Sequence, residues 1–186
     1  MPEAAAPAAA VLRRARAEDA PALAALARWV WLQTYAGEGL RPSFLTYLDQ
    51  AFTPAILEAL MAREDQPMWL LERGAHLLAW THLALDQAPP PDCLRLSPRQ
   101  AELVRLYVAP PCSGQGHGAR LLTQARRALP QHGLWLRAWE GNAGALRFYR
   151  RERARLLGET WFELEGEGHR NEVLGWCAWQ EEQAAS

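Results

Sequence analysis

Cysteine, long apolar runs and an excess of one charge are what this chain of 186 residues has little of. Its three cysteines, Cys93, Cys112 and Cys177, are odd in number and widely spaced, which argues against a disulfide framework and against a zinc site. The formal net charge is −1, from 20 basic and 21 acidic residues, so charge predicts neither a nucleic-acid partner nor an anionic membrane. No apolar run approaches the roughly 20 residues that a membrane span needs. We therefore expect a cytoplasmic protein without metal, nucleic acid or membrane.

What is present is an ordinary globular composition, with 49% hydrophobic and 22% charged residues. This length and composition suit one domain with a full core. The chain opens with MPEAAAPAAA, which has two prolines and no basic stretch, so we expect a disordered tail over 1–10 and no signal peptide. A single domain would then occupy 11–186.

The most informative stretch runs from Glu102 to Leu122 and is typical of a strand, a glycine-rich loop and a helix. Apolar and β-branched residues predict the strand, which Pro110–Pro111 ends because proline has no N–H for a sheet ladder. Glycines follow at 114, 116 and 118, and then the pattern becomes that of an amphipathic helix. Glycines let backbone N–H groups approach a ligand, and a helix start adds unpaired donors and a positive dipole end. The unit therefore predicts an anion cradle, most naturally for a phosphate or pyrophosphate.

The spacing of these glycines separates the loop from other phosphate-binding loops. A P-loop needs lysine and then serine or threonine after the glycines, whereas Gly118 precedes Ala119 and Arg120. The dinucleotide-binding spacing Gly-x-Gly-x-x-Gly is also missed, because a glycine stands at every second position. A flexible loop without a ligand is the alternative, and the flanking strand and well-patterned helix argue against it.

A second cluster follows the strand expected from Leu134 to Trp139, which should lie parallel to the preceding strand through a right-handed crossover. Ligands of open α/β sheets bind beyond the carboxyl ends of parallel strands, so the two strand ends should face one site. Asn142 is a good helix N-cap. Ala145, Phe148 and Tyr149 are three and four residues apart and hence neighbours on a helix surface. Capping and core packing alone would explain these residues in isolation.

Taken together, the two motifs resemble the acetyl-CoA site of the GNAT superfamily of N-acetyltransferases. The resemblance implies that backbone amides of the loop hold the pyrophosphate of coenzyme A, that Asn142 touches the pantetheine arm, and that the Tyr149 hydroxyl faces the sulfur. It implies acetyl-CoA as co-substrate. The implied fold is α/β, with a mixed central sheet of about seven strands, a parallel βαβ unit in its middle and helices on both faces. The residues assigned to the coenzyme are Leu106, Val108, Ser113, Gly114, Gln115, Gly116, His117, Gly118, Asn142, Ala145 and Phe148.

Two positions depart from the family pattern. Where the family usually has Arg or Gln before the glycines, this chain has Ser113. Since the cradle uses mainly backbone amides, we expect weaker coenzyme binding rather than none. After Tyr149 the family usually places a Gly-Phe pair that ends the helix, whereas Arg153 and Ala154 stand here. Without that glycine, the helix should run longer or close in another way.

A closer resemblance is to the branch that contains bacterial polyamine N-acetyltransferases. It covers roughly Val11 to Leu174 and implies direct attack by a primary amine, either a polyamine or another small cationic amine. The overall charge adds no support for a cationic acceptor. Two alternatives stay open: a non-catalytic acyl-CoA-binding sensor, and an acetyltransferase for peptide or protein N-termini. The stretches that carry the resemblance are Gln33-Thr34-Tyr35, Glu102 to Val108, Trp139-Glu140-x-Asn142, and Gly158-Glu159 with Phe162.

Such a reaction needs a base, because only about one in two thousand alkyl amines is neutral at pH 7. Glu102 and Glu140 are the candidate catalytic bases, on the two strands that flank the cleft. Pairing of Glu102 with a neighbouring arginine and helix capping by Glu140 are the structural alternatives. His82 and His169 are weaker candidates, because a histidine in a sheet is more often part of the hydrogen-bonded structure.

Tyr149 is the candidate acid for the leaving thiolate. A phenol has a pKa near 10 and a thiol one near 8.5, so full proton transfer is uphill by about 2 kcal/mol. Tyr149 should therefore act as a hydrogen-bond donor, or have a lowered pKa. A backbone N–H near Val108 would hold the acyl oxygen.

The remaining elements follow from periodicity, caps and turn residues. Gly133 is expected to end the helix that follows the glycine loop. Trp161, Trp176 and Trp179 belong to the last strands, where they form either core or the edge of a homodimer. The expected elements are strands at 11–16, 68–72, 76–85, 156–164 and 172–179, helices at 20–35, 43–50, 54–63 and 142–151, and a loop at 88–99.

Overall fold

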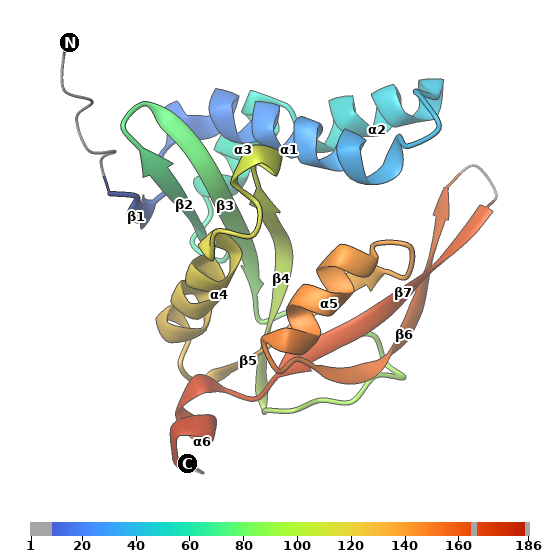
Figure 1. Ribbon diagram of the computed structural model, residues 1–186. Coiled ribbons are helices and arrows are strands. Elements are labelled where there is room, and N and C mark those ends of the chain that lie inside the picture. The colour runs from blue at the N-terminus through green and yellow to red at the C-terminus, as the bar shows by residue number, and fades with distance from the viewer. Residues whose placement is uncertain (1–8, 165–166, 185–186) are drawn as a thin grey trace.

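In the computed structural model, which describes residues 9–164 and 167–184, seven strands form one mixed sheet in the order β1-β2-β3-β4-β5-β7-β6 (Figure 1). Every neighbouring pair is antiparallel except β4 and β5, which are parallel. The expected α/β sheet of seven strands with a parallel unit in its middle is confirmed. The strands are β1 Val11–Arg14, β2 Met68–Arg73, β3 His76–Leu85, β4 Arg99–Val108, β5 His132–Trp139, β6 Arg155–Leu164 and β7 Glu167–Trp176.

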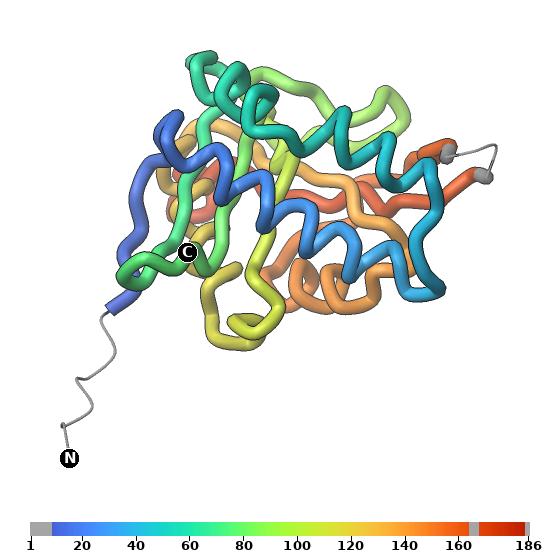
Figure 2. Tube along the Cα trace, turned by 90° about the horizontal axis from the view of Figure 1, so that it is seen from above, coloured from blue at the N-terminus to red at the C-terminus, as the bar shows by residue number. Residues whose placement is uncertain are grey.

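Helices cover both faces of this sheet, as Figures 1 and 2 show from two directions. The first three lie on one face, whereas α4 and α5 lie on the other. Two 3-10 turns, η1 Ala17–Asp19 and η2 Pro110–Cys112, precede α1 and the glycine loop. The helices are α1 Ala20–Tyr35, α2 Pro42–Ala51, α3 Pro54–Met61, α4 His117–Ala128, α5 Ala143–Arg151 and α6 Trp179–Ala184.

Strand β2 shows why both faces need a cover. Its side chains alternate between the faces, as the pleat requires. Met68 and Leu70 pack with α1, α2 and α3, whereas Trp69 and Leu71 pack with α4 and α5, and all four side chains are buried. A strand that is apolar on both faces is stable only between two layers of helices.

The feature that positions the site is a split between the two parallel strands. β4 and β5 pair only from Arg99–Glu102 with His132–Trp135. Beyond that point β4 continues beside β3 as far as Val108, and β5 continues beside β7 as far as Trp139. The carboxyl ends of β4 and β5 therefore diverge, and each has one edge without a strand partner among the described residues.

Several expected boundaries are wrong for identifiable reasons. Gly133 ends no helix but lies in β5, where a Cβ would come within 3.0 Å of the Gln100 side chain, so close packing explains the glycine. β7 runs from Glu167 to Trp176 and not over 172–179. The sequence does not indicate the first half of this strand, because that half is polar and shows no apolar alternation. The tail expected over 1–10 falls mostly outside the described residues.

The three tryptophans of the C-terminal region divide between the core and the surface. Trp176 is core, with 2% of its surface exposed, and its indole N–H donates to the Glu152 carbonyl at 2.8 Å. Trp161 is 67% exposed on the edge strand β6, and Trp179 begins α6. The homodimer stays a prediction, and of these three tryptophans Trp161 is the most exposed.

Candidate functional site

The glycine loop between β4 and α4 has the backbone of an open cradle. Gly114 and Gly116 have φ values of 76° and 80°, in the left-handed region where side chains with a Cβ are strained. A Cβ built on either glycine would meet nothing within 4 Å. The two glycines are therefore explained by the backbone conformation, and the space in front of them is free.

Backbone donors line this space. The six N–H groups from Gly114 to Ala119 donate to no protein acceptor within the part of the chain that the structure describes. The first N–H of this segment with a partner belongs to Arg120, which donates to the Gly116 carbonyl at 3.0 Å. Successive unpaired amides at a helix start are the donor set that binds phosphate oxygens. The loop therefore fits the pyrophosphate that the sequence predicts.

Ser113 directly precedes this donor row, and His117 lies within it. The Ser113 N–H donates to the Pro110 carbonyl at 3.2 Å, so its amide is used by the 3-10 turn. His117 opens α4, and its Nε2 is buried without a hydrogen-bond partner among the described residues. Burial, and then the guanidinium groups of Arg73 and Arg120, lower the pKa of His117. These two cations lie near the cradle and add positive charge to it.

The third glycine joins the two sequence motifs. A Cβ on Gly118 would lie 3.3 Å from the Phe148 ring and 3.7 Å from Val108 Cγ2. The absence of a side chain at Gly118 therefore lets α4 pack closely against α5. This contact brings the end of β4, the start of α4 and the middle of α5 together beside the split.

The edge of β4 offers further backbone groups. The Ala109 N–H donates to the Leu78 carbonyl of β3 at 2.8 Å. Because backbone groups alternate in direction along a strand, those of Val108 and Leu106 point to the other side, toward β5. No strand pairs with them there among the described residues. An extended chain that carries amides could hydrogen-bond to this edge as an added strand does.

Helix α5 is capped at both ends in a way that fixes Tyr149. Asn142 Oδ1 accepts from the Ala145 N–H at 3.0 Å, which leaves the side-chain amide nitrogen as the group that can donate to a ligand. At the other end Arg153 has φ 64°, and the Ala154 N–H donates to the Tyr149 carbonyl at 2.9 Å. The helix is not longer than expected, because an arginine takes the left-handed conformation that usually belongs to glycine.

Tyr149 is buried in the core on the α4 and α5 face of the sheet. Its ring packs edge-on against Phe148 and Trp176, with centroids 5.0 and 6.2 Å apart. Burial, and then the nearby Tyr35, raise the pKa of Tyr149 well above that of an ordinary phenol. The expectation of a lowered pKa is wrong, and the hydrogen-bond donor alternative is the one that fits. Since Tyr35 comes from α1, the two phenols approach each other across the split from opposite faces of the sheet.

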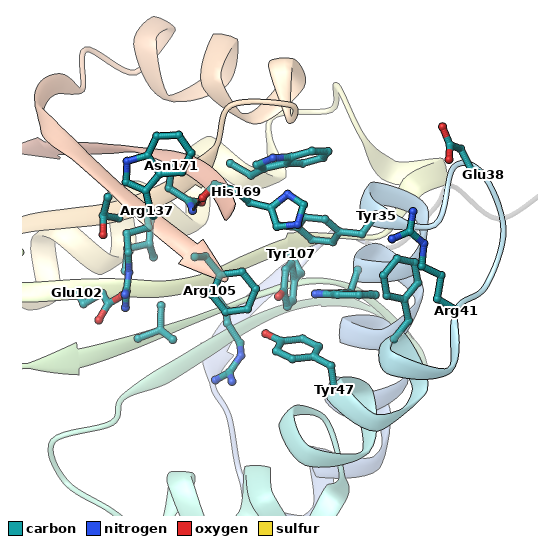
Figure 3. A pocket seen from close by; sticks show the side chains of 18 residues that line it. Tyr35, Glu38, Arg41, Tyr47, Glu102, Arg105, Tyr107, Arg137, His169 and Asn171 are labelled. Carbon is teal, nitrogen blue, oxygen red and sulfur yellow. Dashed lines mark hydrogen bonds and ion pairs between the residues drawn. The ribbon is translucent and has the colours of Figure 1, made fainter. Parts of the chain in front are cut away.

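On the α1 and α2 side of the split lies a cavity of about 580 Å³ that is lined by many aromatic side chains (Figure 3). Three of the chain's four tyrosines line it, and the fourth, Tyr149, is close enough to raise the pKa of Tyr107. Burial and Tyr47 raise the pKa of Tyr35 to about 12. The lining residues are Trp31, Tyr35, Glu38, Arg41, Phe44, Tyr47, Glu102, Leu103, Val104, Arg105, Tyr107, Arg137, Trp139, Thr160, Trp161, Phe162, His169 and Asn171.

The candidate base Glu102 lies in this cavity wall. Arg137 of β5 donates to Glu102 Oε1 through Nη2 at 2.7 Å and through Nε at 3.2 Å. Its partner is therefore not the neighbouring arginine that the sequence suggested. Both bonds reach the same oxygen, so Oε2 remains an available acceptor. His169 lines the cavity too, with its ring edge-on to Trp139 at 6.2 Å.

The other candidate base, Glu140, is not among the lining residues. Its carboxylate pairs with Arg170 at 3.1 Å, and about half of its side chain is exposed. It does not cap α5, because Asn142 does. His82 is held inside the sheet, where burial and Arg105 lower its pKa to about 3. The structure therefore brings Glu102 and His169 to the cavity and places Glu140 and His82 elsewhere.

Part of the cavity was not foreseen from the sequence. The aromatic side chains of α1 and α2 and the arginines of β4 and β5 are far apart along the chain. The resemblance to the polyamine branch marked Tyr35, but no local motif marks Trp31, Tyr47 or Arg137. Only the fold indicates that these side chains meet, because side chains near the carboxyl ends of parallel strands share a site.

Among the described residues no group of three or more His, Cys, Asp or Glu side chains could hold a metal ion. None of the helices within 9–164 and 167–184 is long and apolar enough to cross a membrane. The three cysteines are free thiols.

Known proteins resemble this chain in sequence and in fold. The profile of the acetyltransferase (GNAT) family matches residues 15–153. A probable N-acetyltransferase of Mycobacterium tuberculosis is 28% identical over 159 residues, which are 83% of this chain and 86% of that protein. The structure of a PaiA N-acetyltransferase from Thermoplasma acidophilum in complex with coenzyme A has a TM-score of 0.65 and 20% identity, over 88% of this chain and 98% of that chain. A ribosomal-protein-alanine N-acetyltransferase from Brucella melitensis has a TM-score of 0.63 and 22% identity, over 90% of this chain and 99% of that chain. The chain therefore belongs to the acetyltransferase (GNAT) family and is an N-acetyltransferase.

Proposed function

We propose that this enzyme transfers an acetyl group from acetyl-CoA directly to a primary amine held in the aromatic cavity. One observation carries the proposal: the donor row from Gly114 to Ala119 follows the diverging end of β4, the cavity includes residues of both β4 and β5, and Tyr149 is close enough to Tyr35 and Tyr107 of the cavity wall to affect the pKa values. Two substrates that approach from the two sides would meet at the Tyr149 hydroxyl. Holding both in line removes much of the entropic barrier of a two-substrate reaction.

On the coenzyme side, the residues present fit the predicted ligand. The unpaired amides of the loop would hold the pyrophosphate, and the free edge of β4 would pair with the amides of the pantetheine arm. When bound, acetyl-CoA supplies a thioester, whose carbonyl carbon is the electrophile. The Val108 backbone, which points into the split, is the candidate donor to the thioester oxygen.

Glu102 is the base that the geometry favours. Arg137 holds the carboxylate in the cavity wall through one oxygen, so the other can accept a proton from the incoming ammonium, directly or through a water. The alternative Glu140 pairs with Arg170 on the surface and would need to leave that partner. His169, which lines the cavity, is the second candidate.

Tyr149 would hydrogen-bond to the sulfur as negative charge develops there. Burial raises its pKa above that of an ordinary phenol, so the hydroxyl keeps its proton throughout the neutral range. A thiol has a pKa near 8.5, so the thiolate does not take that proton fully. The contribution is therefore a donated hydrogen bond in a water-poor site, where such bonds stabilise charge strongly.

The cavity wall supports a small amine with an apolar part better than a polyamine. Two carboxylates, Glu38 and Glu102, line it together with three guanidinium groups. One of these carboxylates already pairs with Arg137. A polycation would gain little from such a wall, whereas an apolar side chain would pack against the aromatic rings.

A peptide or protein N-terminus is the second candidate acceptor, and one observation favours it. The β6 side of the cavity wall is formed by Trp161 and Phe162, which remain 67% and 49% exposed. The cavity therefore opens to solvent on that side, where the remainder of a longer chain could leave it.

The test is thiol release from acetyl-CoA with a panel of amines: amino acids, alkylamines, spermidine, aminoglycosides and short peptides, with the acetylated product identified by mass. This chain has no lysine, so its own amines cannot obscure the result except at the N-terminus. Release with one amine class supports the proposal. Stabilisation by acetyl-CoA without release would favour a coenzyme sensor, and neither release nor stabilisation would overturn the coenzyme assignment.

A further inference from the structure

One cation in the cavity wall has no carboxylate partner among the described residues. Arg137 pairs with Glu102, whereas the guanidinium of Arg105 contacts only a histidine and an aromatic ring. Its Nη1 lies 2.7 Å from His82 Nδ1, and its Cζ lies 5.3 Å above the Phe52 ring. Figure 3 shows Arg105 on the same side of the cavity as Tyr47.

The histidine beside Arg105 is neutral and cannot be charged easily. Arginine has no acceptor atom, so His82 Nδ1 must accept from Arg105. The proton of His82 is then on Nε2, which donates to Gln66 Oε1 at 2.7 Å. Burial and the charge of Arg105 hold the pKa of His82 at about 3. The positive charge of this group therefore belongs to Arg105 alone.

The arrangement fixes the guanidinium plane. Phe52 lies beneath it, and His82, itself held by Gln66, fixes one edge. A partly buried guanidinium without a counter-charge is unfavourable, whereas a held one is a preorganised fork for a carboxylate. The remaining N–H groups can meet an anion that enters the cavity.

We propose that Arg105 binds a carboxylate of the acceptor, so that the substrates are small amines that carry a carboxylate and an apolar side chain, of which apolar amino acids are the simplest. This inference rests on the proposed function, since it names the acceptor of the same cavity. The aromatic walls take the apolar side chain, and Glu102 on the same strand faces the amine. Arg105 is then a specificity-determining residue and Glu102 a catalytic one.

The first test compares acceptors that differ only in the carboxylate: L-leucine with 3-methylbutylamine, and L-phenylalanine with 2-phenylethylamine. We expect kcat/KM to be at least tenfold higher for the amino acid of each pair. In Arg105→Met the ratio should fall at least tenfold through a higher KM for the amino acid, and Arg105→Lys should restore part of it. Arg16→Met, at an exposed arginine outside the cavity, should leave the ratio unchanged. A wild-type ratio of one or less, or a ratio that Arg105→Met leaves intact, would overturn the inference.

A binding measurement separates this inference from the proposed function. Trp31 and Trp139 line the cavity, so their fluorescence should report a ligand without any acetyl-CoA. We expect 3-phenylpropanoate to bind at least tenfold more tightly than 3-phenylpropanamide, and Arg105→Met, checked for folding by its melting temperature, to abolish the difference. If no amine is acetylated but this preference is found, the proposed function fails and the anion site stands. If amines are acetylated but the acid and the amide bind equally, the anion site fails alone.

Discussion

The two sides of the split use different chemical groups. The coenzyme side uses backbone: six successive N–H groups, two left-handed glycines and the free edge of β4. The acceptor side uses side chains, with aromatic rings, carboxylates and guanidinium groups from α1, α2, β4, β5, β6 and β7. Tyr149 is the one candidate catalytic residue that reaches from the coenzyme side toward the acceptor side.

This difference explains which substitutions each side tolerates. A backbone cradle depends on glycine positions and on a helix start, so side chains around it can change with little effect. Ser113 is an example, because its side chain departs from the family pattern while the six amides after it remain open. A side-chain cavity, in contrast, changes specificity with each substitution. We therefore expect the coenzyme to be shared across relatives and the acceptor to be particular to this chain.

The largest effect is expected where the two sides meet. Tyr149→Phe should lower kcat by roughly 100-fold, because it removes one hydrogen bond to developing charge in a buried site. Stabilisation by coenzyme A, measured as a thermal shift, should be kept. Tyr47→Phe removes a phenol oxygen from the cavity wall and should change kcat by less than about threefold. An unchanged rate in Tyr149→Phe would mean that the two sides do not meet at this residue.

On the acceptor side, burial of the neutral His82 should make stability fall at acid pH. The folded protein binds a proton at His82 only near pH 3, whereas unfolded histidine does so near pH 6.5. The contribution of His82 to the free energy of unfolding is therefore fully present above about pH 6.5. It falls by about 1.4 kcal/mol per pH unit below that, which is a loss of about 2 kcal/mol at pH 5. When urea unfolding is compared between pH 7.5 and pH 5.0, the free energy of unfolding of His82→Gln should fall by about 2 kcal/mol less than that of the wild type.

An exposed histidine of the same strand is the control for that measurement. His76→Gln, at the start of β3, should keep the wild-type difference between the two pH values. If His82→Gln also keeps it, His82 is not held neutral in the folded protein. The charge in the cavity wall would then be shared between His82 and Arg105.

The coenzyme side can be tested with two glycines that have similar strain. Gly116 has φ 80° and Gly74, in the β2–β3 turn, has φ 59°, and a Cβ on either would meet nothing within 4 Å. Alanine at each should lower stability by about 1 kcal/mol. Only Gly116→Ala should raise the KM for acetyl-CoA, by about tenfold, because its Cβ would enter the cradle. Equal KM values for the two variants would show that the loop does not hold the coenzyme.

The smallest effect concerns the closure of α5. Arg153 has φ 64°, so Arg153→Gly should relieve backbone strain of about 1 to 2 kcal/mol. Part of this gain is offset because glycine raises the conformational entropy of the unfolded chain. A net gain of about 0.5 kcal/mol and a melting temperature higher by about 1 to 2 °C are expected. Arg147→Gly, inside the same helix, should instead cost about 1 kcal/mol. A loss of stability in Arg153→Gly would show that the arginine side chain holds the helix end.

The same contrast decides how much could be predicted from the sequence. The coenzyme side lies in two continuous segments, and strand, glycine loop, helix and the Asn142 cap all follow from local pattern, as the structure bears out. The acceptor side is assembled from six elements, so no window of sequence shows that Arg137 meets Glu102 or that Tyr35 meets Tyr149. Gly133 shows a further limit, because a glycine required by packing in a strand looks locally like a helix end.

The central claim is that both substrates occupy the two sides of the split at once and react directly. Initial rates measured while acetyl-CoA and the best amine of the panel are both varied test this most directly. The structure predicts double-reciprocal lines that intersect, as for a ternary complex. Parallel lines would show that acetyl-CoA leaves an acetyl group on the enzyme before the amine binds, and would contradict direct transfer between the two sides.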